Sequence, residues 1–346
     1  MLSARRSVSA TSDRHALFRR QREERERLEY ELLAPAATRS TESAGREQAE
    51  DQDEFRTAFQ RDRDRILHTK AFRRLKHKTQ VFINPEGDHF VTRLTHTLQV
   101  TQIGRAMAAG LALNEDLTEA ICLGHDVGHS PFGHTGEEAL TPYVGHDWLH
   151  SAHSVRVLSL LEPQNLTREV IDGIRAHSWR VSPPPATPEG QLCRLADRIA
   201  YLTHDAADAI RAGILTFSDL PEPARHRFGG SSREWINQMI RAVIDNSHRQ
   251  GSVSMDPATL DVMNHLRQFM FDHVYLRPEA EFQKERAIIV IKDLMDYFIA
   301  HPEEVPESTT VPDAAPVARA IDFVAGMTDR YALGLHDRLF RPTLFD

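Results

Sequence analysis

The stretch LNEDLTEAICLGHDVGHSPFGHTGEEA, residues 113–139, decides the fold because it encodes one helix, a sharp break and the start of another helix. Asn114 is a favourable N-cap, and the two acids that follow it suit the positive end of a helix dipole. The side chains expected on the inward face of this helix, four residues apart, are Leu117, Ile121 and His125. Pro131 ends the helical pattern, because the residue before a proline is biased away from the helical conformation. A second helix is predicted from His134 onward.

Apolar residues recur at helical intervals over most of the remaining chain. The segments with a helical pattern are residues 14–31, 64–80, 93–110, 192–213, 235–246, 256–271, 278–298 and 316–333. No internal repeat and no series of alternating strand patterns is present, although a short strand near Val81 and Phe82 is compatible with the sequence. We therefore predict an all-α fold, and 346 residues suffice for one large or two modest domains.

Charge and composition indicate a soluble globular protein of the cytoplasm. The chain has 42 Lys and Arg against 50 Asp and Glu, a net charge of -8, and 40% hydrophobic residues, which excludes a disordered chain and a highly basic nucleic-acid binder. The longest apolar run, Ala106–Leu113, is far shorter than the roughly 20 residues that a membrane-spanning helix needs. Residues 1–12 contain no apolar segment of the kind that directs secretion.

Cysteine is scarce, and this restricts the metal sites that the chain can build. Cys122 and Cys193 lie far apart in the sequence, which fits a reducing compartment and excludes both a disulfide scaffold and a zinc site made wholly of thiolates. If the protein binds a metal, nitrogen and oxygen atoms must be the ligands.

A basic strip covers residues 61–78, where eight arginines and lysines face only two aspartates. Taken alone, such a run is typical of a solvated helix face. Beside a metal site it could instead contact a polyphosphate, since arginine and lysine are the residues that bind phosphate groups.

Three predicted helices each carry a metal-capable side chain on or beside a buried stripe. These side chains are His96, the adjacent pair His125 and Asp126, and Asp205. A buried imidazole or carboxylate is costly without a partner, and each one alone could be satisfied by a private hydrogen bond. Together they form a mixed nitrogen and oxygen set that suits Mn²⁺, Mg²⁺, Fe, Co²⁺, Ni²⁺ or Zn²⁺ and leaves coordination positions for water and substrate.

Further histidines follow this pair closely and indicate a pocket that handles protons. His129 lies one turn beyond His125, and a separation of three residues lets Glu137 orient the imidazole of His134. His150 and a neighbouring histidine at position 153 come next along the chain.

These residues lie within four longer motifs. In chain order the motifs are RDRDRILHTKAFRRLKHKTQVF (61–82), GDHFVTRLTHTLQV (87–100), LNEDLTEAICLGHDVGHSPFGHTGEEA (113–139) and ADRIAYLTHDAADAI (196–210). The set resembles the bacterial deoxynucleoside triphosphate triphosphohydrolase family, the dGTPase-like proteins of the HD-domain superfamily, over about residues 53–300.

The resemblance implies an HD-domain helical core with additional C-terminal helices. We expect a charged N-terminal arm and linker over residues 1–52 and the catalytic core over residues 53–230. A C-terminal helical region over residues 231–346 would complete the substrate pocket and make oligomer contacts. Relatives assemble into homo-oligomers, commonly hexamers, and can bind single-stranded DNA, so both kinds of partner are expected.

The resemblance also implies metal-dependent hydrolysis of a dNTP, either dGTP or a broader set, to deoxynucleoside and inorganic triphosphate by water attack at the α-phosphorus. Carried over by position, the metal ligands are His96, His125, Asp126 and Asp205. The catalytic positions are His134, Glu137, His129 and His150, with His153 competing for the last role. Gln80 is expected at the sugar 3′-OH and Arg93 at the α-phosphate.

Two alternatives stay open. The first is another HD-type hydrolase, such as a 5′-nucleotidase or a cyclic-nucleotide phosphodiesterase. The second is a nucleic-acid-binding or nucleotide-sensing regulator whose HD site is idle. The intact set of ligands and the His134–Glu137 pair favour an enzyme.

Overall fold

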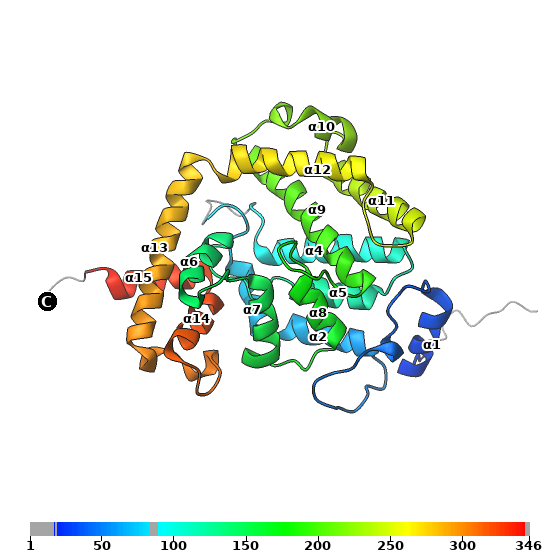
Figure 1. The fold of residues 1–346 in the computed structure, drawn as a ribbon, viewed down its shortest axis with the longest axis horizontal. Helices are drawn as coiled ribbons and strands as arrows, with labels where there is room; N and C mark the ends of the chain where they lie inside the picture. The colour runs from blue at the N-terminus through cyan, green and yellow to red at the C-terminus, as the bar shows by residue number, and fades with distance from the viewer. Residues whose placement is uncertain (1–16, 18, 84–88, 343–346) are drawn as a thin grey trace, which may run out of the picture.

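The fold is all-α, as predicted. The computed structural model describes residues 17, 19–83 and 89–342, and in these residues it contains fifteen α-helices and no strand (Figure 1). The helices are α1 (Arg22–Leu32), α2 (Ala58–His68), α3 (Lys70–Arg74), α4 (Arg93–Gly110), α5 (Glu115–Gly124), α6 (His134–Val144), α7 (His150–Arg156), α8 (Arg168–Ala176), α9 (Pro188–Arg211), α10 (Glu222–Phe228), α11 (Ser232–Gln250), α12 (Pro257–Met270), α13 (Pro278–Ala300), α14 (Pro316–Gly326) and α15 (Asp329–Phe340). Over the described part of the chain, no helix has the length and apolar character needed to cross a membrane.

Local capping sets the ends of the helices that carry the site. The hydroxyl of Thr92 accepts a hydrogen bond from the backbone N–H of Thr95 and starts α4 at the predicted residue. The side-chain oxygen of Asn114 accepts from the N–H of Leu117, 3.2 Å away, and starts α5. These caps leave both helices free to direct their apolar stripes inward.

A first hydrophobic core lies around α4, α5 and α9, and α2, α8, α11 and α12 pack against it (Figure 1). Ile103, Ile121 and Leu202 are fully buried in this core. Burial of such a side chain stabilises the fold by about 1.5–3 kcal/mol. This core holds α4, α5 and α9 in fixed relative positions, and the candidate metal ligands project from these three elements.

A second core joins α6 to the C-terminal helices α13, α14 and α15 (Figure 1). Leu140 of α6 is fully buried in it, together with Ile291, Leu294 and Val324. By contrast, α11 and α12 belong to the first core. The expected boundary between residues 230 and 231 stays a prediction, and the packing places α6 with the last three helices.

Several predicted helices differ from the observed ones. The pattern over residues 64–80 is divided at Thr69, whose extended backbone ends α2 and whose hydroxyl caps α3. The pattern over residues 316–333 is divided into α14 and α15 by an extended residue, Met327. Three short helices, α7, α8 and α10, were not predicted, because seven to nine residues give too few turns for a periodic pattern. Part of the predicted helix over residues 14–31 lies outside the described residues.

Candidate active site

Three helices bring together a cluster of nitrogen and oxygen atoms that could hold a metal ion. One ligand atom each from His96, His125 and Asp197 lies within 4.8 Å of the other two. The Nε2 atom of His96 on α4 is 3.1 Å from Oδ1 of Asp197 on α9. His125 stands directly after the last residue of α5. We call these three residues and Asp126 the ligand cluster.

The tautomer of His125 is set by its backbone neighbour. Its Nδ1 lies 2.7 Å from the carbonyl oxygen of Cys122, which can only accept, so Nδ1 carries the proton. Nε2 therefore presents a lone pair to the cluster, and this buried atom has no hydrogen-bond partner in the part of the chain that the structure describes. Burial lowers the pKa of His125 and keeps the ring neutral. A buried, unpartnered imidazole nitrogen beside two other donors is what a divalent cation would satisfy.

Asp126 adds a carboxylate to the same place. Its Oδ1 lies 3.6 Å from Nε2 of His125, and its Oδ2 accepts a hydrogen bond of 2.7 Å from the guanidinium of Arg93. Burial alone would raise the pKa of Asp126, but the neighbouring His125 and Arg93 hold it well below its usual range. Asp126 is thus a carboxylate that joins the ligand cluster to Arg93.

The structure does not bring Asp205, expected as the fourth ligand, into this cluster. Asp205 lies eight residues after Asp197 on α9, about 12 Å further along the helix axis. Its Oδ2 accepts a hydrogen bond of 2.7 Å from the hydroxyl of Tyr275. Burial raises the pKa of Asp205 to about 7, although Tyr275 opposes the shift. The structure therefore brings Asp197, rather than the expected Asp205, beside His96 and His125.

A signal for Asp197 exists in the sequence. It lies four residues after Cys193 and next to Ala196, both of which belong to the buried stripe of α9. Asp205 satisfies the same helical pattern, so periodicity alone could not choose between the two carboxylates. The choice depends on where along α9 the helix passes His96.

A second group of ionisable residues adjoins the ligand cluster. It consists of His129, His134, Glu137 and His150, and we call it the imidazole cluster. Oε2 of Glu137 lies 3.2 Å from Nδ1 of His134, and Oε1 accepts from the backbone N–H and from Nδ1 of His150. The ring of His129 stacks on that of His150, with centroids 4.3 Å apart. The four predicted catalytic side chains thus lie together in the structure.

Exposure differs sharply within the imidazole cluster. The side chain of His134 is 76% exposed, whereas those of Glu137 and His129 are 6% and 0% exposed. Burial raises the pKa of Glu137, but His150 and His134 outweigh it and hold the pKa well below its usual range. Glu137 is therefore an anion that orients a reachable imidazole, as a general acid or base requires.

His177, which was not predicted, extends a chain of hydrogen bonds that runs from Glu137 through His150. Its Nδ1 lies 2.7 Å from the carbonyl oxygen of Ile174 and must carry the proton, so its Nε2 accepts. Nε2 of His150 lies 3.0 Å away and donates to it, while Nδ1 of His150 donates to Glu137. His150 is thus doubly protonated, and although burial opposes this charge, Glu137 raises its pKa. His177 directly follows the last residue of α8 and lies outside the four motifs, so no motif predicted it.

His153 does not join the imidazole cluster. Its Nδ1 donates to the carbonyl oxygen of Gly128, and its Nε2 lies 3.8 Å from Asp322. A Cβ at position 128 would come within 2.2 Å of the backbone nitrogen of Ser154, so glycine is needed for α7 to pack on the loop. This close approach places His150, one turn earlier on α7, beside Glu137.

The two expected substrate contacts lie near the loop that precedes His134. Arg93 is 2% exposed, and within residues 17, 19–83 and 89–342 the buried side-chain oxygen of Gln80 has no hydrogen-bond partner. Gly133 has a φ of +62°, and a Cβ there would lie 2.8 Å from Nη2 of Arg93. The loop therefore leaves one guanidinium edge of Arg93 uncovered by any side chain at position 133.

Four arginines of the basic strip over residues 61–78 pair with acids of the same chain. Arg63 pairs with Asp116, and Arg74 pairs with Glu162. Lys78 differs from these arginines, because it is 2% exposed and its Nζ donates to the carbonyl oxygens of His129 and Ala325. These contacts favour a structural role for the arginines over phosphate binding.

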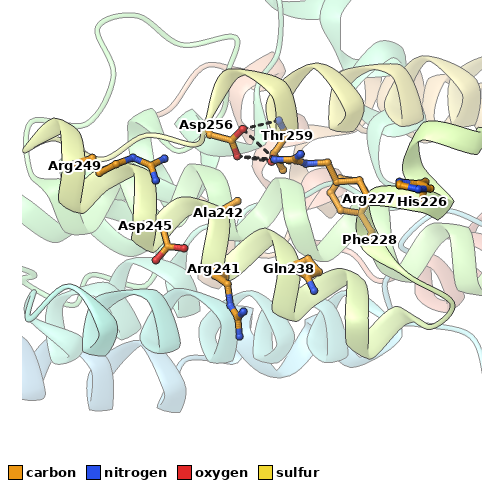
Figure 2. A pocket seen from close by; sticks show the side chains of 10 residues that line it. All are labelled: His226, Arg227, Phe228, Gln238, Arg241, Ala242, Asp245, Arg249, Asp256 and Thr259. Atoms are coloured by element: carbon orange, nitrogen blue, oxygen red, sulfur yellow. Dashed lines mark hydrogen bonds and ion pairs between the residues drawn. The ribbon is translucent and has the colours of Figure 1, made fainter.

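A hollow of about 560 Å³ lies apart from both clusters, between α10, α11 and α12 (Figure 2). Its lining residues are His226, Arg227, Phe228, Gln238, Arg241, Ala242, Asp245, Arg249, Asp256 and Thr259. Arg227 is already paired with Asp256 across this groove. None of the predicted site residues lines it, so the chemistry is to be sought at the two clusters.

Two family models match the chain. Residues 93–202 match the HD domain, and residues 253–338 match the phosphohydrolase-associated domain. The first range contains both clusters, whereas the second contains α13, α14 and most of α15.

Curated relatives match almost the whole chain. A deoxyguanosinetriphosphate triphosphohydrolase-like protein of Caldanaerobacter subterraneus subsp. tengcongensis is 48% identical over 93% of this chain and 96% of its own length. Proteins with the same description from Desulfatibacillum aliphaticivorans and Clostridium perfringens are 43% and 42% identical, and each match covers 93% of this chain and 98% of the relative.

Proposed function

This chain belongs to the deoxyguanosinetriphosphate triphosphohydrolase-like family of HD-domain phosphohydrolases, and from this premise we propose that it hydrolyses deoxynucleoside triphosphates. The products are the deoxynucleoside and inorganic triphosphate, and water attacks the α-phosphorus. The resemblance inferred from the four motifs is confirmed by these relatives, whereas the substrate and the products are our proposal.

One observation carries the proposal, namely that the ligand cluster and the imidazole cluster lie next to each other. Asp126 of the ligand cluster binds Arg93, and its Oδ1 lies 3.6 Å from Nε2 of His150 in the imidazole cluster. Phosphoryl transfer to water needs charge neutralisation beside a group that can move a proton. Both requirements are met within one small region of the chain.

The donor set of the ligand cluster fits a divalent cation. His96, His125, Asp126 and Asp197 would hold it, and the unpartnered Nε2 of His125 supports this assignment. Mn²⁺, Mg²⁺, Fe²⁺, Co²⁺, Ni²⁺ and Zn²⁺ all accept such ligands. When bound, the ion would supply positive charge against the phosphate oxygens and lower the pKa of water.

His134 is suited to move the proton. Its Nδ1 is held by Glu137 at 3.2 Å, so the exposed Nε2 faces outward with a fixed tautomer. A buried carboxylate behind an imidazole holds the ring in one orientation, as proton transfer at a defined atom requires. Nε2 of His134 can therefore exchange a proton with water or with the departing O5′ atom.

Arg93 and Gln80 supply substrate contacts in this proposal. The Arg93 guanidinium is held by Asp126 and is positively charged, so it can meet an α-phosphate oxygen without reorganising. The buried oxygen of Gln80 has no hydrogen-bond partner among the described residues and can accept from the sugar 3′-OH. These two residues would place the α-phosphorus between the clusters.

Product analysis tests the proposal. Purified protein with Mn²⁺ is incubated with each dNTP, singly and in mixtures, and with deoxynucleoside monophosphates and cyclic nucleotides. We expect deoxynucleoside and triphosphate from at least one dNTP. Pyrophosphate release would contradict the proposal, and hydrolysis of only monophosphates or cyclic nucleotides would favour a different HD hydrolase.

A matched pair of histidine variants links that activity to the site. His134→Ala should lower kcat by about 100-fold or more, since general acid–base catalysis contributes about 10²–10⁴-fold. His336→Ala is the control, because His336 on α15 also forms a carboxylate pair, with Asp293 at 2.8 Å, but belongs to neither cluster. Equal effects of the two substitutions would contradict the assignment.

Two partners expected from the family also remain proposals for this chain. Homo-oligomers, with hexamers as the expected form, are tested by light scattering of the purified protein, where a monomer mass at micromolar concentration would count against assembly. Single-stranded DNA is tested by fluorescence anisotropy with a labelled oligonucleotide at several salt concentrations. Absence of any salt-dependent binding would exclude it.

A further inference from the structure

One carboxylate from the C-terminal helices holds two loop segments of the site. Asp329, the first residue of α15, is 4% exposed. Its Oδ1 accepts from the backbone N–H of Phe132 at 3.0 Å, and its Oδ2 accepts from the backbone N–H of Thr79 at 2.8 Å and from the Thr79 hydroxyl. These partners lie 197 and 250 residues away in the sequence. The start of α15 favours this negative charge, since the N-terminal end of a helix dipole is positive.

The first of these segments leads to both expected substrate contacts. Thr79 directly precedes Gln80 in the sequence, and it forms an isolated bridge with Thr92. The carbonyl oxygen of the preceding residue, Lys78, accepts from the backbone N–H of Arg93 at 3.2 Å. A displacement of Thr79 would therefore shift Gln80 and the first residue of α4 together.

The second segment leads to the proton-moving histidine. Phe132 has a φ of +60°, which is a rarely adopted conformation for a residue with a bulky side chain. Gly133 follows at +62°, and His134 then begins α6. Such a backbone persists only when its surroundings hold it. The N–H of Phe132 is held by Asp329, and its ring is buried in the second core.

Lys78 forms a second link between the same parts of the chain. Its Nζ donates to the carbonyl oxygen of His129 in the imidazole cluster and to that of Ala325, 3.1 Å away, in the last turn of α14. Lys78 as a whole is 2% exposed. The loop that carries His129 and the end of α14 are therefore tied at a second point.

We propose that Asp329 is a positioning residue of the phosphohydrolase site, which it serves by fixing Gln80 and His134 relative to each other. This inference rests on the function proposed above. Within the described part of the chain, Asp329 forms no hydrogen bond or ion pair with either cluster and acts through Thr79 and the backbone of Phe132. Lys78 ties the loop at His129 to the end of α14. The C-terminal helices thus take part in catalysis although none of their side chains belongs to the ligand cluster or the imidazole cluster.

The variant Asp329→Asn tests this role. The amide keeps the size of the side chain, but its Nδ2 would face an N–H group where an acceptor is needed. We expect kcat to fall about 10- to 100-fold, because a misplacement of a catalytic group by about 1 Å costs roughly that much. The melting temperature should change little more than in the control variant described next. The Michaelis constant should rise less than kcat falls.

Asp62→Asn is the matched control. Asp62 on α2 is fully buried, and its Oδ2 accepts from the N–H and the hydroxyl of Thr167 at 2.9 and 2.7 Å, the same pattern that Asp329 forms with Thr79. It lies away from both clusters. We expect Asp62→Asn to destabilise the protein but to leave kcat within about twofold of the parent at a temperature where both are folded.

Hydrogen exchange separates failure of this inference from failure of the proposed function. In Asp329→Asn, the peptides that contain residues 77–81 and 129–134 should exchange at least tenfold faster, while peptides of α9 remain unchanged. This readout needs no substrate, so it decides the positioning role even if the parent protein hydrolyses no dNTP. Unchanged exchange in both peptides would overturn the inference, as would a kcat loss that Asp62→Asn reproduces.

Discussion

Metal binding should depend on Asp197 and not on Asp205. Bonds from a divalent ion to nitrogen or oxygen are about 2.0–2.2 Å long, so two ligand atoms of one ion lie at most about 4.4 Å apart. Nε2 of His96 and Oδ1 of Asp197 meet this limit with a separation of 3.1 Å. Asp205 lies two helical turns further along α9, and its carboxylate accepts a hydrogen bond from the hydroxyl of Tyr275.

The substitutions are Asp197→Asn and Asp205→Asn, which are matched because each replaces a carboxylate of α9 by an amide of the same shape. Loss of an outer-shell partner already weakens metal binding by about 10- to 100-fold, so loss of a ligand should weaken it by at least about 100-fold. We therefore expect Asp197→Asn to bind Mn²⁺ at least about 100-fold more weakly than the parent, and Asp205→Asn to bind it within about threefold of the parent.

The assay is elemental analysis of desalted, Mn²⁺-loaded protein, followed by titration of the apoprotein with Mn²⁺. Circular dichroism confirms that each variant is folded, so the measurement does not depend on activity. If Asp205→Asn loses the metal while Asp197→Asn retains it, the ligand cluster assigned from the structure is wrong.

Three other substitutions probe the same region. Burial lowers the pKa of Lys78 to about 7, so between pH 7 and 9 the unfolded chain binds a proton that the folded chain lacks, and stability rises with pH. In urea unfolding, the free energy of unfolding of the parent should rise by about 2 kcal/mol more than that of Lys78→Met across this range. The same pH dependence in both proteins would contradict a buried neutral amine. Gly133→Ala places a Cβ 2.8 Å from Nη2 of Arg93 at a positive φ. The variant should therefore lower the free energy of unfolding by about 1–2 kcal/mol and raise the Michaelis constant. Parent-like values for both quantities would refute a clash between this Cβ and Arg93. Glu137→Gln removes the charge that orients His134, so kcat should fall about 100-fold in steady-state assays, and a loss under threefold would exclude that role.

Local sequence patterns predicted the helices that carry the site. The Thr92 and Asn114 caps act within one turn of their own helices, so the starts of α4 and α5 could be inferred without knowledge of the fold. Short helices were missed for the opposite reason. The seven residues of α7 form a helix because they pack on the loop at Gly128, which is a contact between distant segments.

Periodicity and short motifs were enough to predict the helical class and the family, and the same motifs indicated the residues for the proposed chemistry. The His125–Asp126 pair and the His134–Glu137 spacing are properties of single segments. The preference for Asp197 over Asp205 needed the three-dimensional structure, since both carboxylates lie on α9 and, of the two, Asp197 groups with His96 and His125. The distance between a carboxylate on α9 and His96 on α4 depends on how the two helices pack, and no local sequence pattern encodes that packing.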